Sequence, residues 1–201
     1  MSVATIQNGI TTELAAKLAA SGFRKESRYL IARSWGDGIA QVKCALWNDR
    51  FSGSPKAAMT FGVRFEDVQA LVGQPEDDPD ISTIATPSHL LHEDQRDGPW
   101  NAEQPGLAMI LFDEVQTFGV PFFQMYSNID NVLLSLKSEN PLNWFTLGPN
   151  NRLLWLFAIL AVRREKDTAL TLLDKEIELR RDRPYGDRWR FDQLRERIHK
   201  L

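Results

Sequence analysis

Two neighbouring segments of the chain alternate apolar and more polar side chains, one residue at a time. Their apolar positions are Val42, Cys44 and Leu46 in the first segment and Ala57, Met59, Phe61, Val63 and Phe65 in the second. A period of two places successive side chains on opposite faces of a strand, so each segment has one face suited to a core. A third segment, 28–35, runs into Gly36-Asp37-Gly38, which is typical of a tight turn. We therefore predict a β-meander over residues 23–65.

The other segments predict helices. Residues 10–20 fit a helix with Leu14 and Leu18 facing inward, Thr11 or Thr12 as its cap and Gly22 after its end. Residues 107–118 repeat apolar side chains at helical spacing and stop at Gly119. After residue 151 the pattern is helical throughout. The segments 152–163 and 168–180 are joined by so short a connection that we predict an antiparallel αα-hairpin.

These patterns together predict an α+β fold. The predicted sheet is antiparallel, has three or four strands between residues 23 and 95, and ends in a strand over 88–95. Helices 10–20 and 107–118 are expected on its inner face. We assign residues 1–140 to this sheet domain and residues 141–201 to a C-terminal helical extension that packs on it, as one globular unit.

Bulk composition bounds the class of protein. Of the 201 residues, 43% are hydrophobic and 25% are charged, which is typical of a globular domain. The single cysteine, Cys44, excludes an intramolecular disulfide and a cysteine-rich zinc site. Residues 1–8 lack the features of a signal peptide, and the most apolar run, 153–162, is too short to span a bilayer, so we expect a cytoplasmic protein. We predict that the protein binds no cofactor.

Charge is unevenly distributed along the chain. Between residues 74 and 97 the only base is Arg96, whereas the acids are Glu76, Asp77, Asp78, Asp80, Glu93, Asp94 and Asp97. Clustered charge of one sign steers association with an oppositely charged partner, although solvated surface is the ordinary explanation of such clusters. Our candidate residues for binding a basic protein partner are Glu76, Asp77, Asp78 and Asp80. Trp100, which follows the turn Asp97-Gly98-Pro99, is the candidate aromatic anchor, with a place in the core as its alternative.

A second hypothesis is a small hydrolase or metal-dependent enzyme that uses His89, His92, Glu93 and Asp94. On a helix the two histidines would share one face and could ligate a metal. On the strand that we predict for this segment they point to opposite faces, and their spacing differs from that of the zinc protease motifs. We therefore favour an exposed polar strand end and predict neither a metal ligand nor a catalytic residue here.

A third hypothesis is nucleic-acid binding through the C-terminal helix, which interleaves charged and aromatic residues: Tyr185, Arg188, Trp189, Arg190, Arg195 and Arg197. Arginines grip phosphates, and aromatic rings stack on bases. The chain, however, carries a net charge of −3, whereas dedicated nucleic-acid binders have a basic domain. The apolar side of this helix favours docking on the protein itself, so we do not expect nucleic acid as a partner.

The order of several short motifs resembles a family of bacterial proteins catalogued as a domain of unknown function. The matching residues are Gly22-Phe23, Tyr29, Gln41-Val42, Trp47, Phe61-Gly62-Val63, Trp100 and Gly119-Val120-Pro121-Phe122. The resemblance extends over residues 10–180 and implies no established activity. It does imply an immunity role for at least part of the family, because some relatives are encoded beside genes of contact-dependent or polymorphic toxins.

The function expected from these observations is a non-catalytic protein-binding module, as an immunity-type toxin inhibitor that acts by occlusion rather than chemistry. A toxin that attacks nucleic acid is often basic, and an acidic inhibitor would complement its charge.

Overall fold

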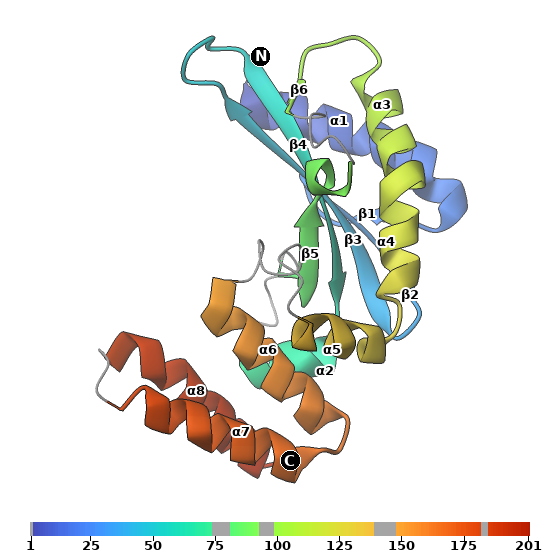
Figure 1. Ribbon diagram of the computed structural model, residues 1–201. Coiled ribbons are helices and arrows are strands. Elements are labelled where there is room, and N and C mark those ends of the chain that lie inside the picture. The colour runs from blue at the N-terminus through green and yellow to red at the C-terminus, as the bar shows by residue number, and fades with distance from the viewer. Residues whose placement is uncertain (1, 74–80, 93–98, 139–147, 182–184) are drawn as a thin grey trace. The chain divides into compact units, whose positions relative to one another are not determined.

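The computed structural model of the chain describes residues 2–73, 81–92, 99–138, 148–181 and 185–201. Backbone contacts divide the chain into two compact units (Figure 1). Unit 1 comprises Met1–Arg64 and Ile84–Asn128, and unit 2 comprises Phe65–Thr83 and Ile129–Leu201. Unit 2 therefore differs from the predicted extension over residues 141–201. It also includes Phe65–Thr83, and its second segment already begins at Ile129.

Unit 1 is built on an antiparallel sheet, so the predicted α+β class is confirmed. Its strands are β1 (Arg24–Lys25), β2 (Leu30–Trp35), β3 (Gly38–Asn48), β4 (Pro55–Arg64), β5 (Ile84–Pro87) and β6 (Trp100–Asn101). They pair in the order β1-β2-β3-β4-β5, and β6 also pairs with β4. The strand count exceeds the predicted three or four because β1 and β6 are only two residues long, too short to show an alternating pattern.

The last predicted strand, 88–95, does not form over residues 88–92, and residues 93–95 lie outside the described residues. The strand β5 ends at Pro87, and Ser88–Leu91 forms a turn of 3₁₀-helix, η2. Register explains the difference, because Ile84 lies opposite Val63 and Thr86 opposite Phe61, so the β-branched residues of β5 face the core side of β4. Proline cannot donate to a ladder, which suits Pro87 to the end of a strand.

The first helix, α1 (Val3–Leu18), begins earlier than the predicted residue 10 and continues into η1 (Ala19–Ser21). Its cap is Ser2, whose side chain accepts a hydrogen bond from the Thr5 amide. The Thr12 hydroxyl instead donates to the Asn8 carbonyl within the helix, so the predicted threonine cap is wrong. Gly22 follows with a φ of 80°, as expected of the residue that ends a helix.

The helix predicted over 107–118 does not end at Gly119. Helix α3 (Leu107–Glu114) passes through one π-helical turn, η3 (Val115–Gly119), into α4 (Val120–Met125). Gly119 has a φ of −67°, and a Cβ on it would lie 2.9 Å from Phe61 Cε1. A glycine at this position therefore allows the helix to approach the sheet closely, and it does not form a turn. Pro121 lies in the first turn of α4, where a missing N–H is tolerated.

Helices α1, α3 and α4 lie on one side of the sheet (Figure 1), and the core of unit 1 fills the space between. Phe123 on α4 is fully buried at its centre. Its ring lies 5.8–5.9 Å from those of Phe23, Trp35, Phe61 and Phe122, centroid to centroid. The alternation that predicted the meander thus directs its apolar face toward this aromatic cluster.

Cys44 provides a titration test of that inward face. It is 1% exposed, and burial raises the pKa of its thiol from 9.0 to about 12. Above pH 9 the unfolded chain releases the thiol proton and the folded chain keeps it, so this group destabilises the fold as the pH rises from about 9 to 12. We expect the stability advantage of wild type over Cys44→Ala, measured by urea unfolding, to shrink by about 1.4 kcal/mol between pH 7 and pH 10.

Met59 lies directly opposite Cys44 on β4, is equally buried and does not titrate. The difference between wild type and Met59→Leu should therefore stay constant over the same pH range. A Cys44→Ala difference that also stayed constant would show that the thiol is not buried as described.

In the residues of unit 2 that the structure describes, every regular element is a helix. Its helices are α2 (Glu66–Val72), α5 (Ile129–Lys137), α6 (Gly148–Val162), α7 (Lys166–Leu179) and α8 (Tyr185–His199). Helices α6 and α7 form the predicted αα-hairpin, and α2 packs against α6 and α8. Arg164, with a φ of 67°, ends α6: its amide donates to the Ala161 carbonyl and the Glu165 amide to the Leu160 carbonyl. This bond pattern is a Schellman motif, and it reverses the chain within three residues.

Within the described part of the chain, every helix is too short or too polar to cross a bilayer.

Candidate functional site

The hairpin of β3 and β4 extends past the rest of the sheet. Strand β2 pairs with β3 only from Gly38 to Lys43, whereas the ladder of β3 with β4 continues to the pair Asn48–Pro55. On the other side of the hairpin, β6 covers only Lys56 and Ala57 of β4. We call residues 44–58 the ribbon, since they form a two-stranded projection of unit 1.

The loop at the end of the ribbon is ordered by one carboxylate. Asp49 accepts hydrogen bonds from the Ser52 hydroxyl at 2.7 Å and from the Phe51 amide at 3.2 Å. These bonds, that of Ser52 above all, lower the pKa of Asp49. Backbone bonds from Asp49 N–H to the Ser54 carbonyl and from Gly53 N–H to the Asp49 carbonyl close the loop. The tip of the ribbon therefore has a defined conformation.

Two large aromatic side chains stand out from this ordered ribbon. Phe51 at its tip is 100% exposed, and Trp47 on β3 is 41% exposed. Register places Trp47 opposite Lys56 and Ala45 opposite Ala58, on the face of the sheet that the helices do not cover. Ordered, exposed aromatic residues are the side chains that most often anchor protein–protein interfaces.

Trp100, the anchor predicted from the sequence, lies next to the ribbon in β6. It is half-buried and pairs with Ala57, while Asn101 pairs with Lys56. Because cross-strand partners share a face, Trp100 lies on the helix-covered side of the sheet and Trp47 on the other. The two tryptophans thus lie on opposite faces of the same sheet. The other candidate residues, Glu76, Asp77, Asp78 and Asp80, lie outside the described residues.

The histidines of the enzyme hypothesis lie in and after the turn η2. His92 Nε2 is 2.8 Å from Glu114 Oε1, and its ring centroid is 4.0 Å from that of Phe118. Both side chains of the His92–Glu114 pair are at most 10% exposed, and the pair joins the residue after η2 to the last residue of α3. Glu93 and Asp94 lie outside the described residues, and among the residues that are described no three His, Cys, Asp or Glu side chains form a group that could hold a metal.

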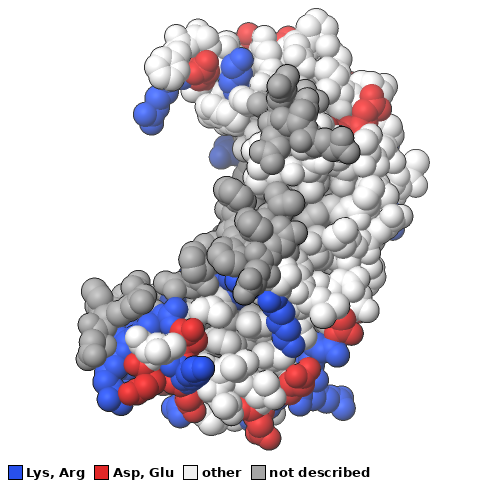
Figure 2. All heavy atoms as spheres, in the orientation of Figure 1, with Lys and Arg blue, Asp and Glu red and all other residues white. Residues whose placement is uncertain are grey.

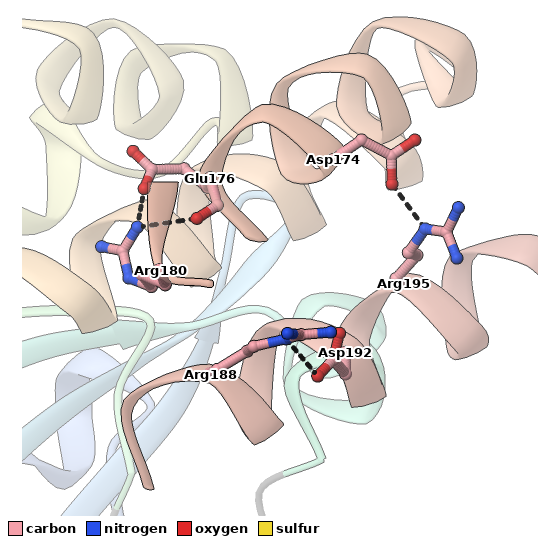
Figure 3. A network of polar contacts seen from close by, with 6 residues as sticks. All are labelled: Asp174, Glu176, Arg180, Arg188, Asp192 and Arg195. Carbon is pink, nitrogen blue, oxygen red and sulfur yellow. Dashed lines mark hydrogen bonds and ion pairs between the residues drawn. The ribbon is translucent and has the colours of Figure 1, made fainter. Parts of the chain in front are cut away.

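The arginines of α8 each contact another residue of unit 2. Arg195 Nε donates to Asp174 Oδ1 on α7, and Arg188 Nε donates to Asp192 Oδ2 within α8 (Figure 3). Arg190 bonds to the Asn151 side chain, and Arg197 Nη1 donates to the Leu71 carbonyl at the end of α2 at 3.1 Å. In Figure 2, acidic and basic side chains are intermixed over this part of the surface. These contacts favour a structural role for the arginines over a phosphate-binding one.

Sequence reasoning did not single out the ribbon, although a signal was present. Ala45 and Trp47 occupy the positions of β3 that alternate with its apolar face, so the pattern already places Trp47 on the opposite side. The alternation along β3 does not show how long β2 is, and the length of β2 determines how much of β3 projects beyond the sheet. Comparison of the chain with protein-family models, with curated proteins and with solved structures found no match.

Proposed function

We propose that this chain is a non-catalytic, cytosolic protein-binding module that acts by occlusion, as an immunity-type inhibitor does. The observation that carries the proposal is the ribbon, which holds Trp47 and Phe51 exposed on an ordered loop. Exposed Trp47 and Phe51 do not stabilise the fold itself. A partner that buries them gains binding free energy from the apolar area, and the loop needs no further ordering because it is already ordered. The family resemblance supports the immunity role.

The charge of the chain adds a second, independent support. The acids Glu76, Asp77, Asp78 and Asp80 follow one another closely in the sequence, and such a cluster favours a partner of positive charge. The proposal needs no catalytic group, since an inhibitor that covers a surface works through contact area and residence time.

The test is capture of a partner from host lysate, supplemented with the products of the genes beside this one. We expect the double variant Trp47→Ala/Phe51→Ala to bind the captured partner about 30-fold or more weakly, since aromatic anchors contribute about 2 kcal/mol or more. Titration calorimetry with the purified partner would give the two affinities. Inhibition of the partner should saturate at one chain per partner molecule, as expected of occlusion.

The matched control is Met109→Ala, because Met109 is another exposed apolar residue of unit 1, 48% exposed on α3. It should leave the affinity unchanged. Turnover of the partner at substoichiometric amounts of this chain would contradict occlusion. An unchanged affinity of the double variant would remove the ribbon from the interface.

A further inference from the structure

The continuous helix formed by α3, η3 and α4 carries little charge. In the whole chain 25% of residues are charged, whereas within residues 107–125, all of which the structure describes, the charged residues are Asp113 and Glu114. Glu114 is buried beside His92, so Asp113 is the charge that remains on the outer side of the helix. In Figure 2 the surface over this helix is mostly white. We call its outer side the long-helix face.

Large apolar side chains are exposed at both ends of the long-helix face. Met109 and Ile110 are 48% and 40% exposed near its start, and Met125 is 60% exposed at its end. Thr117, which is exposed and uncharged, lies midway between them. Interfaces between proteins are depleted of charge at their centre and enriched in methionine, so this face has the composition of a contact surface.

The exposed residues are arranged symmetrically about Thr117. Met109 precedes it by eight positions and Met125 follows it by eight. Ile110 and Gln124 are each seven positions away. Two copies of the helix that run antiparallel and cross at Thr117 therefore bring each Met109 against the Met125 of the other copy. A two-fold interface must be complementary to itself, whereas binding a different protein does not require this symmetry.

We propose that the long-helix face pairs two copies of this chain as an antiparallel, two-fold dimer. The inference goes beyond the proposed function and does not depend on it. Helices that cross at about 20° stay in contact along their length, as this pairing requires. The two Asp113 carboxylates would be about 12 Å apart along the helix axis, more than the screening length of about 10 Å at 0.1 M salt. Charge therefore does not oppose the pairing.

The size of the face determines the strength of the dimer. At about 1.5 Å per residue the helix is about 28 Å long and roughly 10 Å wide, so each copy contributes about 300 Å². The total of about 600 Å² is half or less of the area of a stable interface, which buries roughly 1,200 Å² or more. We therefore expect a reversible dimer with a Kd of about 100 µM.

Sedimentation equilibrium of the whole chain tests the inference. With a Kd of about 100 µM, about 70% of the chains should be in dimers at about 500 µM, and less than about 10% at about 5 µM. The average mass should rise accordingly from that of one chain toward that of two. A mass that stays at that of one chain at the highest concentration would overturn the inference.

Paired charges test the direction of the two helices. Met109→Lys and Met125→Glu should each weaken the dimer at least about tenfold, because each places an unpaired charge against an apolar side chain. The double variant Met109→Lys/Met125→Glu should dimerise more tightly than either single variant, because each introduced lysine meets a glutamate of the other copy. The control is Leu134→Lys, at an exposed leucine of α5, which should leave the Kd unchanged. A double variant as weak as the single variants would overturn the inference.

The same variants distinguish a second copy from the captured partner as the occupant of this face. If the occupant is a second copy, Met109→Lys keeps its affinity for the partner while its own dimer weakens. A face whose Met109→Lys variant loses the partner, in a chain that never dimerises, would belong to the partner, and that result would overturn the inference.

Oxidative cross-linking tests the position of the two-fold axis. The single native cysteine, Cys44, is buried, so an introduced cysteine reports its own position. Thr117→Cys lies on the axis, where the Cα atoms of the facing helices come within about 7 Å and can be joined by a disulfide. Met109→Cys lies about 24 Å from its copy in this pairing and is the matched control. With copper phenanthroline as oxidant, Thr117→Cys should form covalent dimers at least about tenfold faster, and equal rates would overturn the inference.

Discussion

Replacing Phe123 with alanine should cost about 3–5 kcal/mol of the free energy of unfolding, among the largest losses that a single truncation in this chain can produce. Phe123 is 0% exposed and touches four other rings, one of which, Phe61, it meets edge-on at 84°. Truncation removes the transfer free energy of the ring and leaves a cavity between α4 and the sheet. Rings on three different elements line that cavity, so it cannot collapse by a small shift of one of them.

Urea unfolding followed by circular dichroism measures the loss, and hydrogen exchange at the amides of β3 and β4 assigns it to unit 1. The control is Met125→Ala on the same helix, because Met125 is 60% exposed and its truncation should change stability by less than about 0.5 kcal/mol. If Phe123→Ala does not fold, Phe123→Leu should still fold with a loss of about 1–2 kcal/mol. A cost for Phe123→Ala below about 1 kcal/mol would contradict the central place of this ring.

Replacing Gly36 with alanine should cost about 2–5 kcal/mol, through strain rather than through a cavity. Gly36 turns β2 into β3 with a φ of 57°, and the Asp37 amide donates to the Ser127 carbonyl at 3.0 Å. A Cβ on Gly36 would lie 2.3 Å from that same carbonyl oxygen. Because the obstacle is backbone, it cannot rotate away as a side chain would, and the hydrogen bond must lengthen or break.

Gly53 offers a closely matched control for this prediction. Its φ is 68°, so an alanine there suffers the same backbone penalty, but no atom lies within 4 Å of the added Cβ. Gly53→Ala should therefore cost only about 1–2 kcal/mol. The difference between the two variants in urea unfolding isolates the clash with Ser127. Equal costs would show that the turn and Ser127 are not in contact.

The sequence predicts the centre of the sheet well because its pattern is local and repeated. Val42, Cys44, Met59 and Phe61 all point inward as their alternation requires, and each is almost fully buried. The sequence does not show which role a glycine has, because a glycine that ends a helix and a glycine that allows a close contact look alike in it. Gly22 ends a helix with a left-handed conformation, whereas Gly119 is helical and makes room for Phe61, a residue distant in the chain.

The candidate site, too, has one part that a local sequence pattern predicts and one part that depends on contacts between residues distant in the chain. The alternation along β3 predicts that Trp47 is exposed. How far the ribbon projects depends instead on the difference in length between β2 and β3. Strand β2 begins only at Leu30, and beyond it Cys44 is held by the Tyr29 carbonyl and by the side chain of Gln7 on α1. Residue propensities carry no information about either contact, because both join residues that are distant in the chain. The β-branched residues of β5 were equally visible, yet only the register with β4 shows where that strand ends.

The interleaving of the two units along the chain has a consequence for synthesis on the ribosome. Unit 1 needs residues up to Asn128, and unit 2 uses α2 from the first half of the chain together with helices that begin at Ile129 or later. The apolar side of α2, with Val68 and Leu71, therefore leaves the exit tunnel long before α6 and α8, which cover it, have been made. During that interval the nascent chain carries an uncovered apolar helix, the kind of surface that chaperones recognise. Neither unit can be obtained by simply cutting the gene at one point.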